Sequence, residues 1–194
     1  GKGWSLFGDA DYKAKGGMTL PIPKPQMPDI PALEPQQLYA MLKDRGFTDT
    51  AARGIMGNFY AESKLDPDAM QLNDGPGRGL AQWERGGRFD TDPLNLSDFS
   101  MEKGTSWRDP ATQLDFMVAE MDRSEKFGEV RDAMNKAKSP TEAANIFLKG
   151  YEKANPKHET YEASVKQRGD YATEFTPEEP GFLDTITDML RGLF

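Results

Sequence analysis

The chain has 194 residues, of which 37% are hydrophobic and 29% charged, enough apolar content for one compact domain plus additional segments. It has no cysteine and one histidine, His158, which excludes disulfides, cysteine nucleophiles and zinc sites built from cysteine or several histidines. The net charge of −8 disfavours nucleic-acid binding and charge-driven adhesion to anionic membranes. We predict no metal or other cofactor, expect His158 to be a surface residue, and expect hydrolytic chemistry to depend on carboxylates.

Residues 1–35 are predicted to form an extended N-terminal arm and linker. Residues 1–19 are rich in glycine and lack helical periodicity, and the segment LPIPKPQMPDIPALEP then places a proline every few residues. Because proline fixes φ and lacks an amide donor, this segment is predicted to be a semi-rigid spacer. No basic start is followed by an apolar block, so we expect no secretory signal peptide.

Residues 36–176 are predicted to form a mainly α-helical domain. Apolar residues recur at helical spacing in the segments 34–47, 48–63, 109–123, 139–154 and 159–175. Thr48 and Ser139 are predicted N-caps, Glu142 completes a capping-box pattern with Ser139, and Gly46 is a natural stop for the first helix. No strand pattern of comparable length is present, and the only β element we allow for is a short hairpin near 84–108.

Residues 177–194 are predicted to form a linker and an amphipathic C-terminal helix. The segment GFLDTITDMLRGLF places its apolar residues on one stripe, after prolines that end the preceding helix. Its polar face is acidic or neutral, unlike the basic face of a membrane-surface helix, so stable membrane anchoring is not expected. Two uses remain open, a helix that covers the domain and a helix that docks on a partner protein.

The segment AESKLDPDAMQLNDGPGRGLAQW, residues 61–83, contains the candidate site. Glu62 stands at the edge of an apolar helix face, where partial burial would raise its pKa, as the general acid of glycosidic cleavage requires. Pro67 then ends the helix, and a glycine-rich turn lets the backbone approach a ligand closely. Gln82 offers a donor and an acceptor, and Trp83 a flat apolar face, both suited to sugars.

AESKLDPDA followed by GRGLAQW resembles the lysozyme-like superfamily, which includes goose-type lysozymes and soluble lytic transglycosylases. GIMGNFYAES, GLAQW and GYEKANP are more closely similar to motifs of the phage tail lysozymes. The resemblance covers about residues 36–176 and implies a lysozyme-like fold that cleaves the β-1,4 bond between N-acetylmuramic acid and N-acetylglucosamine in peptidoglycan. It implies that Glu62 is the catalytic acid, that Ser63 contacts substrate or orients the acid, that Gln82 lines the sugar groove, and that Tyr151 lies close to the acid.

The sequence does not decide which residue supplies a second catalytic carboxylate. Asp74, in the glycine-rich turn, is the candidate catalytic partner of Glu62, while Glu84 is within reach in sequence but reads more readily as a surface charge. Glu152 is expected to be structural, bonded to backbone or to an arginine. A lytic transglycosylase uses a hydroxyl of the substrate and needs only one acid, so hydrolysis and transglycosylation are both compatible with the sequence.

The leading hypothesis is a phage virion-associated muramidase that aids local penetration of the cell wall during infection. Its partners would be peptidoglycan glycan strands and, through the N-terminal arm and C-terminal helix, other virion or tail proteins. An enzyme released from the host cytosol late in infection fits the absence of a signal peptide equally well. Two non-enzymatic alternatives are an assembly or ejection protein that retains a lysozyme-like body, and a glycan-binding module that uses Trp83 and Trp107 as sugar platforms.

Overall fold

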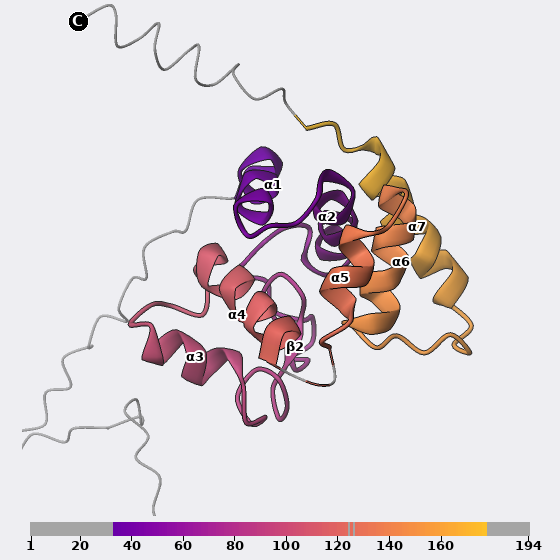
Figure 1. The fold of residues 1–194 in the computed structure, drawn as a ribbon. Coiled ribbons are helices and arrows are strands. Elements are labelled where there is room, and N and C mark those ends of the chain that lie inside the picture. Colours follow the sequence, from indigo (N-terminus) through magenta and orange to yellow (C-terminus); the bar gives the residue numbers. More distant parts are fainter. Residues whose placement is uncertain (1–32, 124, 126, 178–194) are drawn as a thin grey trace, which may run out of the picture. The chain divides into compact units, whose positions relative to one another are not determined.

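A computed structural model describes residues 33–123, 125 and 127–177, which form a mainly helical, lysozyme-like body (Figure 1). The helices are α1 (Pro35–Asp44), α2 (Asp49–Ser63), α3 (Leu96–Glu102), α4 (Pro110–Arg123), α5 (Val130–Asn135), α6 (Pro140–Gly150) and α7 (Tyr161–Glu174). Strands β1 (Gly77–Arg78) and β2 (Trp83–Glu84) pair antiparallel as a small hairpin. The predicted fold class is confirmed, while most of the N-terminal arm and the C-terminal helix lie outside the described residues and stay predictions.

The N-terminal ends of α2 and α6 follow from local sequence. The Thr48 hydroxyl accepts from the amide of Ala51 at 3.2 Å, and the Ser139 hydroxyl accepts from the amide of Glu142 at 3.1 Å. The Glu142 carboxylate accepts from the amide of Lys138, one residue before the one a capping box uses, so this detail of the prediction is corrected. The hydrogen bonds of the Thr48 and Ser139 hydroxyls confirm both predicted N-caps.

Between α2 and α4 the structure differs from the prediction. The hairpin occupies residues 77–84, and most of 84–108 forms turns and α3, whose N-cap Asn95 accepts from the amide of Asp98 at 2.8 Å. Neither α3 nor α5 was predicted, because helices of 7 and 6 residues are too short to establish an apolar periodicity. The predicted helix 139–154 also ends earlier, at Gly150.

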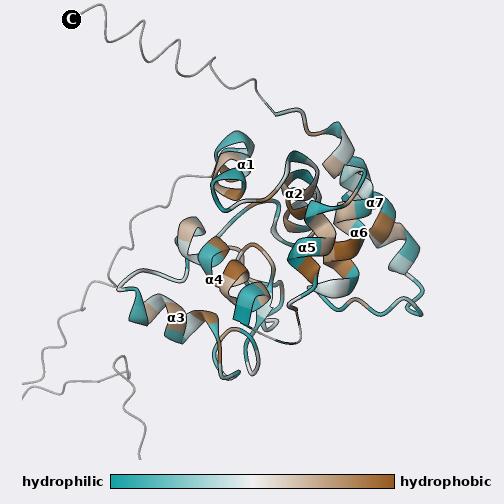
Figure 2. Ribbon diagram, in the orientation of Figure 1, coloured by the Kyte–Doolittle hydropathy of each residue, from teal (hydrophilic) through white to brown (hydrophobic). Residues whose placement is uncertain are grey.

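Helix α2 is the centre of the packing. It contacts α6 and α7, which also contact each other, while α1 packs on α2 and α4, α3 on α4, and α5 on α6. Figure 2 shows the helices with distinct hydrophobic and hydrophilic faces. In the part of the chain that the structure describes, no helix combines the length and apolarity needed to cross a bilayer.

Two glycines of α2 allow this close packing. A Cβ atom at Gly54 would lie 2.6 Å from the Cβ of Ala143 in α6. A Cβ atom at Gly57 would collide with the carbonyl oxygen of Arg168 in α7. Without side chains at these positions the three helix backbones approach each other, and Arg168 is brought against the last turns of α2.

Candidate active site

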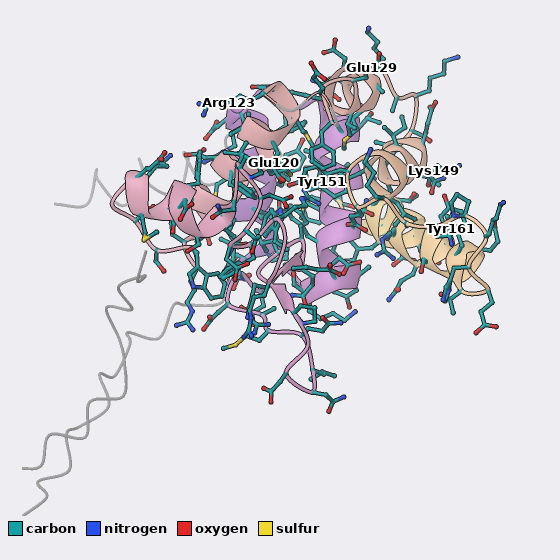
Figure 3. The ribbon with its side chains drawn as sticks, turned by 90° about the horizontal axis from the view of Figure 1, so that it is seen from below. Glu120, Arg123, Glu129, Lys149, Tyr151 and Tyr161 are labelled. Carbon is teal, nitrogen blue, oxygen red and sulfur yellow. The ribbon has the colours of Figure 1, made fainter. Side chains whose placement is uncertain are left out.

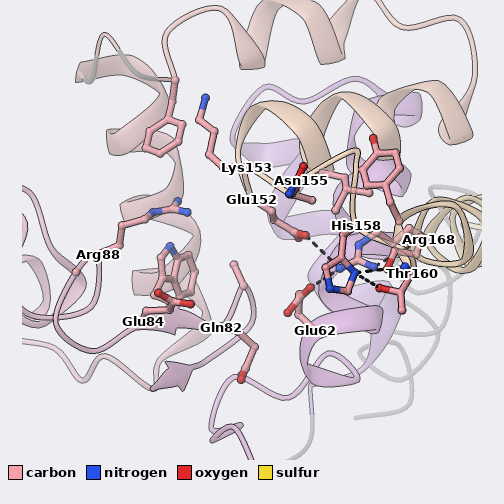
Figure 4. A pocket seen from close by; sticks show the side chains of 18 of the residues that line it. Glu62, Gln82, Glu84, Arg88, Glu152, Lys153, Asn155, His158, Thr160 and Arg168 are labelled. Atoms are coloured by element: carbon pink, nitrogen blue, oxygen red, sulfur yellow. Dashed lines mark hydrogen bonds and ion pairs between the residues drawn. The ribbon is translucent and has the colours of Figure 1, made fainter. Parts of the chain in front are cut away.

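A cleft of about 600 Å³ opens between the end of α2, the β2 hairpin strand and the loop that joins α6 to α7 (Figure 4). Its helical wall comprises Glu62, Glu152 and the first turns of α7, and its other wall comprises residues 81–84 and the loop that follows them. Charged side chains of both signs line the cleft. A polar groove of this size is suited to a hydroxyl-rich ligand.

Glu62 lies in the last turn of α2, and its side chain points into the cleft (Figure 4). Helix α2 ends just beyond it, because Lys64 adopts a left-handed conformation with φ of +57° and Pro67 follows. The Glu62 side chain is 27% exposed, and Oε1 accepts a hydrogen bond from Nη2 of Arg168. Burial raises the pKa of Glu62 above its ordinary value, while the Arg168 charge opposes the rise.

Glu152 is the second carboxylate beside Arg168. Nη2 of Arg168 also donates to Oε2 of Glu152 at 3.2 Å, and the Arg168 and Glu152 side chains are only 8% and 10% exposed. Burial raises the pKa of Glu152 to about 8, the neighbouring Glu62 charge adds to the rise, and Arg168 opposes it. The expectation that Glu152 pairs with an arginine is confirmed.

Gln82 reaches the cleft and Ser63 lies beneath it. The Gln82 side chain lines the cleft with Glu62, held by a 2.9 Å hydrogen bond from its amide nitrogen to the carbonyl of Gly79. The buried Ser63 hydroxyl lies 2.9 Å from the carbonyl oxygen of Phe59 and 3.0 Å from that of Leu80. Ser63 therefore ties the end of α2 to the segment that carries Gln82. This arrangement fits orientation of the acid better than contact with substrate.

Trp83 and Tyr151 are interior residues, with exposed fractions of 1% and 0%. The Trp83 indole donates to the Tyr151 hydroxyl at 3.0 Å, and that hydroxyl donates to Glu120, its neighbour in the interior (Figure 3). Arg88 closes the network with hydrogen bonds of 2.8 and 2.7 Å to the two carboxylate oxygens of Glu120. Trp83 borders the cleft but is almost fully buried, so its ring has no exposed face for a sugar, and its interpretation as a sugar platform is corrected. That Tyr151 lies close to Glu62 stays a prediction.

Asp74 stands apart from the cleft. It lies exposed in the turn after Gln71, with φ of +55°, and is not among the residues that line the cleft. Glu84 does line it, on the hairpin side, while Glu62 lies on the helical side (Figure 4). Of the two carboxylates that sequence placed near Glu62, the structure therefore brings Glu84 to the cleft and leaves Asp74 outside it.

The remaining sequence candidates also have definite positions. His158 is exposed on the loop before α7, as predicted, where its Nδ1 lies 2.9 Å from the Thr160 hydroxyl. Trp107 packs edge-on against Phe89, with ring centroids 5.2 Å apart, and does not line the cleft. Among residues 33–177 as described, no group of three or more His, Asp or Glu side chains is arranged to hold a metal ion.

Sequence reasoning did not identify Arg168, Arg88 or Glu120. The role of each depends on a partner at least 31 positions away, as in the Glu120–Tyr151 hydrogen bond. A charge that is paired across such a separation leaves no local signature. One usable signal was the neighbouring Gly169, an isolated glycine inside a helical pattern, which can indicate close packing against another element.

Two comparisons with known proteins bear on this site. The family model for phage tail lysozyme matches residues 34–177, which includes the whole cleft. Morphogenesis protein 1 of Bacillus phage B103 is 33% identical over 131 residues, an alignment that covers 62% of this chain and 34% of that protein. The chain thus corresponds to about a third of the length of that relative.

Proposed function

Because the chain belongs to the phage tail lysozyme family, we propose that it is a virion-associated muramidase that cleaves the β-1,4 bond between N-acetylmuramic acid and N-acetylglucosamine. Cleavage would open peptidoglycan locally and aid entry into the host cell. The observation that carries the proposal is the position of Glu62, a partly buried carboxyl group at the edge of a cleft large enough for a glycan strand.

In the proposed mechanism Glu62 protonates the glycosidic oxygen as the bond breaks. A general acid works best when its pKa lies near the working pH, and burial moves the pKa of Glu62 upward in that direction. Gln82, across from Glu62 in the cleft, would hydrogen-bond sugar hydroxyl or acetamido groups. The carboxylates that line the cleft would stabilise the positive charge that develops on the sugar ring.

The product of cleavage depends on which group attacks the sugar when the glycosidic bond breaks. If water attacks, Glu84 is the carboxylate that we propose to activate it, since it lines the opposite wall, whereas Asp74 lies outside the cleft. If a hydroxyl of the muramic acid attacks instead, no second carboxylate is required. The product decides: a free reducing end indicates hydrolysis, and an anhydro ring indicates transglycosylation.

Replacement of Glu62 tests the proposal. Glu62→Gln should abolish release of muropeptides from purified peptidoglycan, because an amide cannot donate the proton, while the melting temperature stays within a few degrees of wild type. Mass spectrometry of the digest gives both the yield and the product type. Glu102→Gln, the same change at an exposed position at the end of α3, is the matched control and should cleave normally. Equal cleavage by Glu62→Gln and wild type would exclude Glu62 as the acid.

A second function has one observation in its favour, since the phage B103 relative is named a morphogenesis protein. In that case the chain would serve assembly or DNA ejection and retain a lysozyme-like body. The absence of any product from wild-type digests, with folded protein, would support this alternative. The glycan-binding alternative has less support, because Trp83 borders the cleft but is only 1% exposed and Trp107 does not line it.

We further propose that the protein is a component of the virion, in the tail or inside the particle. Residues 1–35 and 177–194 would connect the catalytic domain, residues 36–176, to other virion proteins. This division agrees with the family match, which begins at residue 34 and ends at 177. Peptidoglycan strands would then be met only when the particle reaches the wall.

A further inference from the structure

The mechanism above gives no role to Arg168, the cation beside Glu62. Nη2 of Arg168 donates to Oε1 of Glu62 and, at 3.2 Å, to Oε2 of Glu152. The Arg168 side chain is only 8% exposed, and its Nη1 lies 3.5 Å from the carbonyl oxygen of Ser164 in the preceding turn of α7. The absence of a side chain at Gly57 lets the Arg168 backbone approach α2 closely. The guanidinium is thus fixed against the end of the helix that carries Glu62.

We propose that Arg168 is a positioning residue for Glu62, which holds Oε1, leaves the proton to Oε2, and stabilises the carboxylate that forms when this proton is donated. The inference rests on the proposed function, because Glu62 is the general acid there. An oxygen that accepts a hydrogen bond from a guanidinium is not the one expected to carry the carboxyl proton. Oε2 therefore donates, from a side chain that points into the cleft (Figure 4).

The proton transfer creates a negative charge beside Arg168. The proton passes from Oε2 of Glu62 to the glycosidic oxygen, and the bond from that oxygen to the sugar carbon breaks with its electron pair left on the oxygen. Glu62 becomes a carboxylate, which forms a charge-assisted hydrogen bond with Arg168. A cation fixed where negative charge develops lowers the barrier without having to move during the reaction.

Glu152 leaves the charge of Arg168 to Glu62. Oε1 of Glu152 is buried and has no hydrogen-bond partner among the described residues, which is costly for an ionised carboxylate and less so for a neutral one. Burial raises the pKa of Glu152 to about 8, and the charge of Glu62 adds to the rise. Below that pH Glu152 keeps its own proton and is a neutral partner of the guanidinium, so Glu62 is the acid whose ionised form balances Arg168.

Two opposing effects set the acidity of Glu62. Burial raises its pKa, whereas the charge of Arg168, its hydrogen bond and a smaller contribution from Glu152 lower it. With burial alone, Glu62 would hold its proton too tightly to release it as the glycosidic bond breaks. Because a general acid works best when its pKa lies near the working pH, a cation that limits the rise favours catalysis.

Other charged or ionisable groups also face the cleft. They lie on the hairpin wall and on the loop and first turn that lead into α7, and they are Glu84, Arg88, Asp92, Lys153, His158 and Tyr161. Arg88 is bound to Glu120. The main influences on the pKa of Glu62 are burial, Arg168 and Glu152. Arg168 is therefore the cation whose removal should change the titration of Glu62 most.

Carboxyl-detected NMR titration of the full-length chain tests the proposal without requiring activity. The reference protein is Glu152→Gln, in which a neutral amide replaces the second acid, so that removal of the arginine does not leave two buried acids together. The Glu62 signal is the one lost when Glu62→Gln is added. Adding Arg168→Gln to the reference should raise the titration midpoint of Glu62 by about 1 pH unit or more. Equal midpoints with and without Arg168 would overturn the proposal.

Two further variants of the reference protein separate charge from shape. Arg168→Lys keeps the positive charge and should recover most of the midpoint shift, whereas a shift as large as that of Arg168→Gln would show that charge is not the cause. Arg123→Gln removes an exposed arginine at the end of α4, outside the cleft lining, and should leave the midpoint unchanged. An equal shift in Arg123→Gln would also contradict the proposal.

Kinetics distinguish this role from a merely structural one. Relative to the reference, Arg168→Gln should lower kcat on the acidic plateau by roughly 10-fold, because the acid donates less readily, and leave KM nearly unchanged. The alkaline limb of the rate, where Glu62 loses its proton, should move to higher pH with the NMR midpoint. A fall in kcat with no movement of the limb would indicate a structural role only.

Wild-type protein provides a test if the Arg168 variants do not fold. The nitrogen signals of the Arg168 side chain, identified by their loss in Arg168→Lys or by sequential assignment, should shift with the same midpoint as the Glu62 carboxyl. Arg168 signals that do not respond at that midpoint would overturn the proposal. Failure of the proposed function looks different, since these titrations would behave as expected while wild-type protein releases no product from peptidoglycan.

Discussion

At the scale of single residues, the pKa values of Glu62 and Glu152 in the cleft depend on how far burial removes each carboxyl group from water. Glu62 is 27% exposed and Glu152 is 10% exposed, and burial raises the pKa of both. Desolvation penalises the charged form, and Arg168 limits that penalty without removing it.

The raised pKa of Glu152 predicts a pH dependence of stability. Its pKa is about 8 in the folded chain and near 4.5 when exposed, so between these values the folded state binds more protons than the unfolded state. The free energy of unfolding therefore falls as pH rises through this window, by at most about 1.4 kcal/mol per pH unit for one proton. Thermal melting from pH 5 to 8 should show wild type losing stability relative to Glu152→Gln. Parallel curves for the two proteins would contradict this assignment.

At the scale of elements, the site is assembled by side chains that bind backbone groups of distant segments. Gln113 of α4 is fully buried, and its side chain bonds to the backbone of three such segments. Its Oε1 accepts from the amide of Leu80 at 2.8 Å, and its Nε2 donates to the carbonyls of Pro67 at 2.6 Å and Trp107 at 2.8 Å. Together with Ser63, it fixes the turn that presents Gln82 to the cleft.

Replacement of Gln113 should therefore destabilise the protein. Gln113→Leu has nearly the same size but leaves buried backbone donors and acceptors without partners, each costing about 1–3 kcal/mol. We expect a lower denaturation midpoint in urea, followed by the tryptophan fluorescence of the chain. Gln167→Leu, the same change at an exposed position of α7, is the control and should shift the midpoint little. A Gln113→Leu midpoint equal to that of wild type would show that the turn does not depend on these hydrogen bonds.

The same elements show what the sequence could predict. The long helices and the caps at Thr48 and Ser139 are encoded within a few residues, and the motif around Glu62 marks Glu62 and Gln82 as candidate residues of the cleft. The inward turn of Trp83 and Tyr151 depends on Glu120 and Arg88, which come from α4 and from the loop after β2. Arg168 reaches Glu62 only because Gly57 lets α7 approach α2. Pairings of this range depend on tertiary packing, which local patterns do not specify.

At the scale of the whole molecule, the question is which parts of the chain the lysozyme-like body needs in order to fold. The core cluster and the hydrophobic residues packed against it run from Leu33 to Phe175. The family match covers almost the same range, 34–177. The apolar stripe of the segment 181–194 lies outside the described residues, and we propose that it docks on another virion protein.

Deletion of residues 181–194 distinguishes docking from core packing. If the segment docks on a partner, the shortened protein should keep its melting temperature and its rate of cleavage on purified peptidoglycan, because the cleft and the core cluster lie within 33–177. It should be lost from purified virions, which quantitative mass spectrometry of particles can measure. A chain ending at residue 160 lacks α7 and Arg168, and as the control it should lose both folding and cleavage. If the deletion of 181–194 alone made the protein insoluble or lowered its melting temperature by many degrees, the stripe would instead belong to the core of the folded domain.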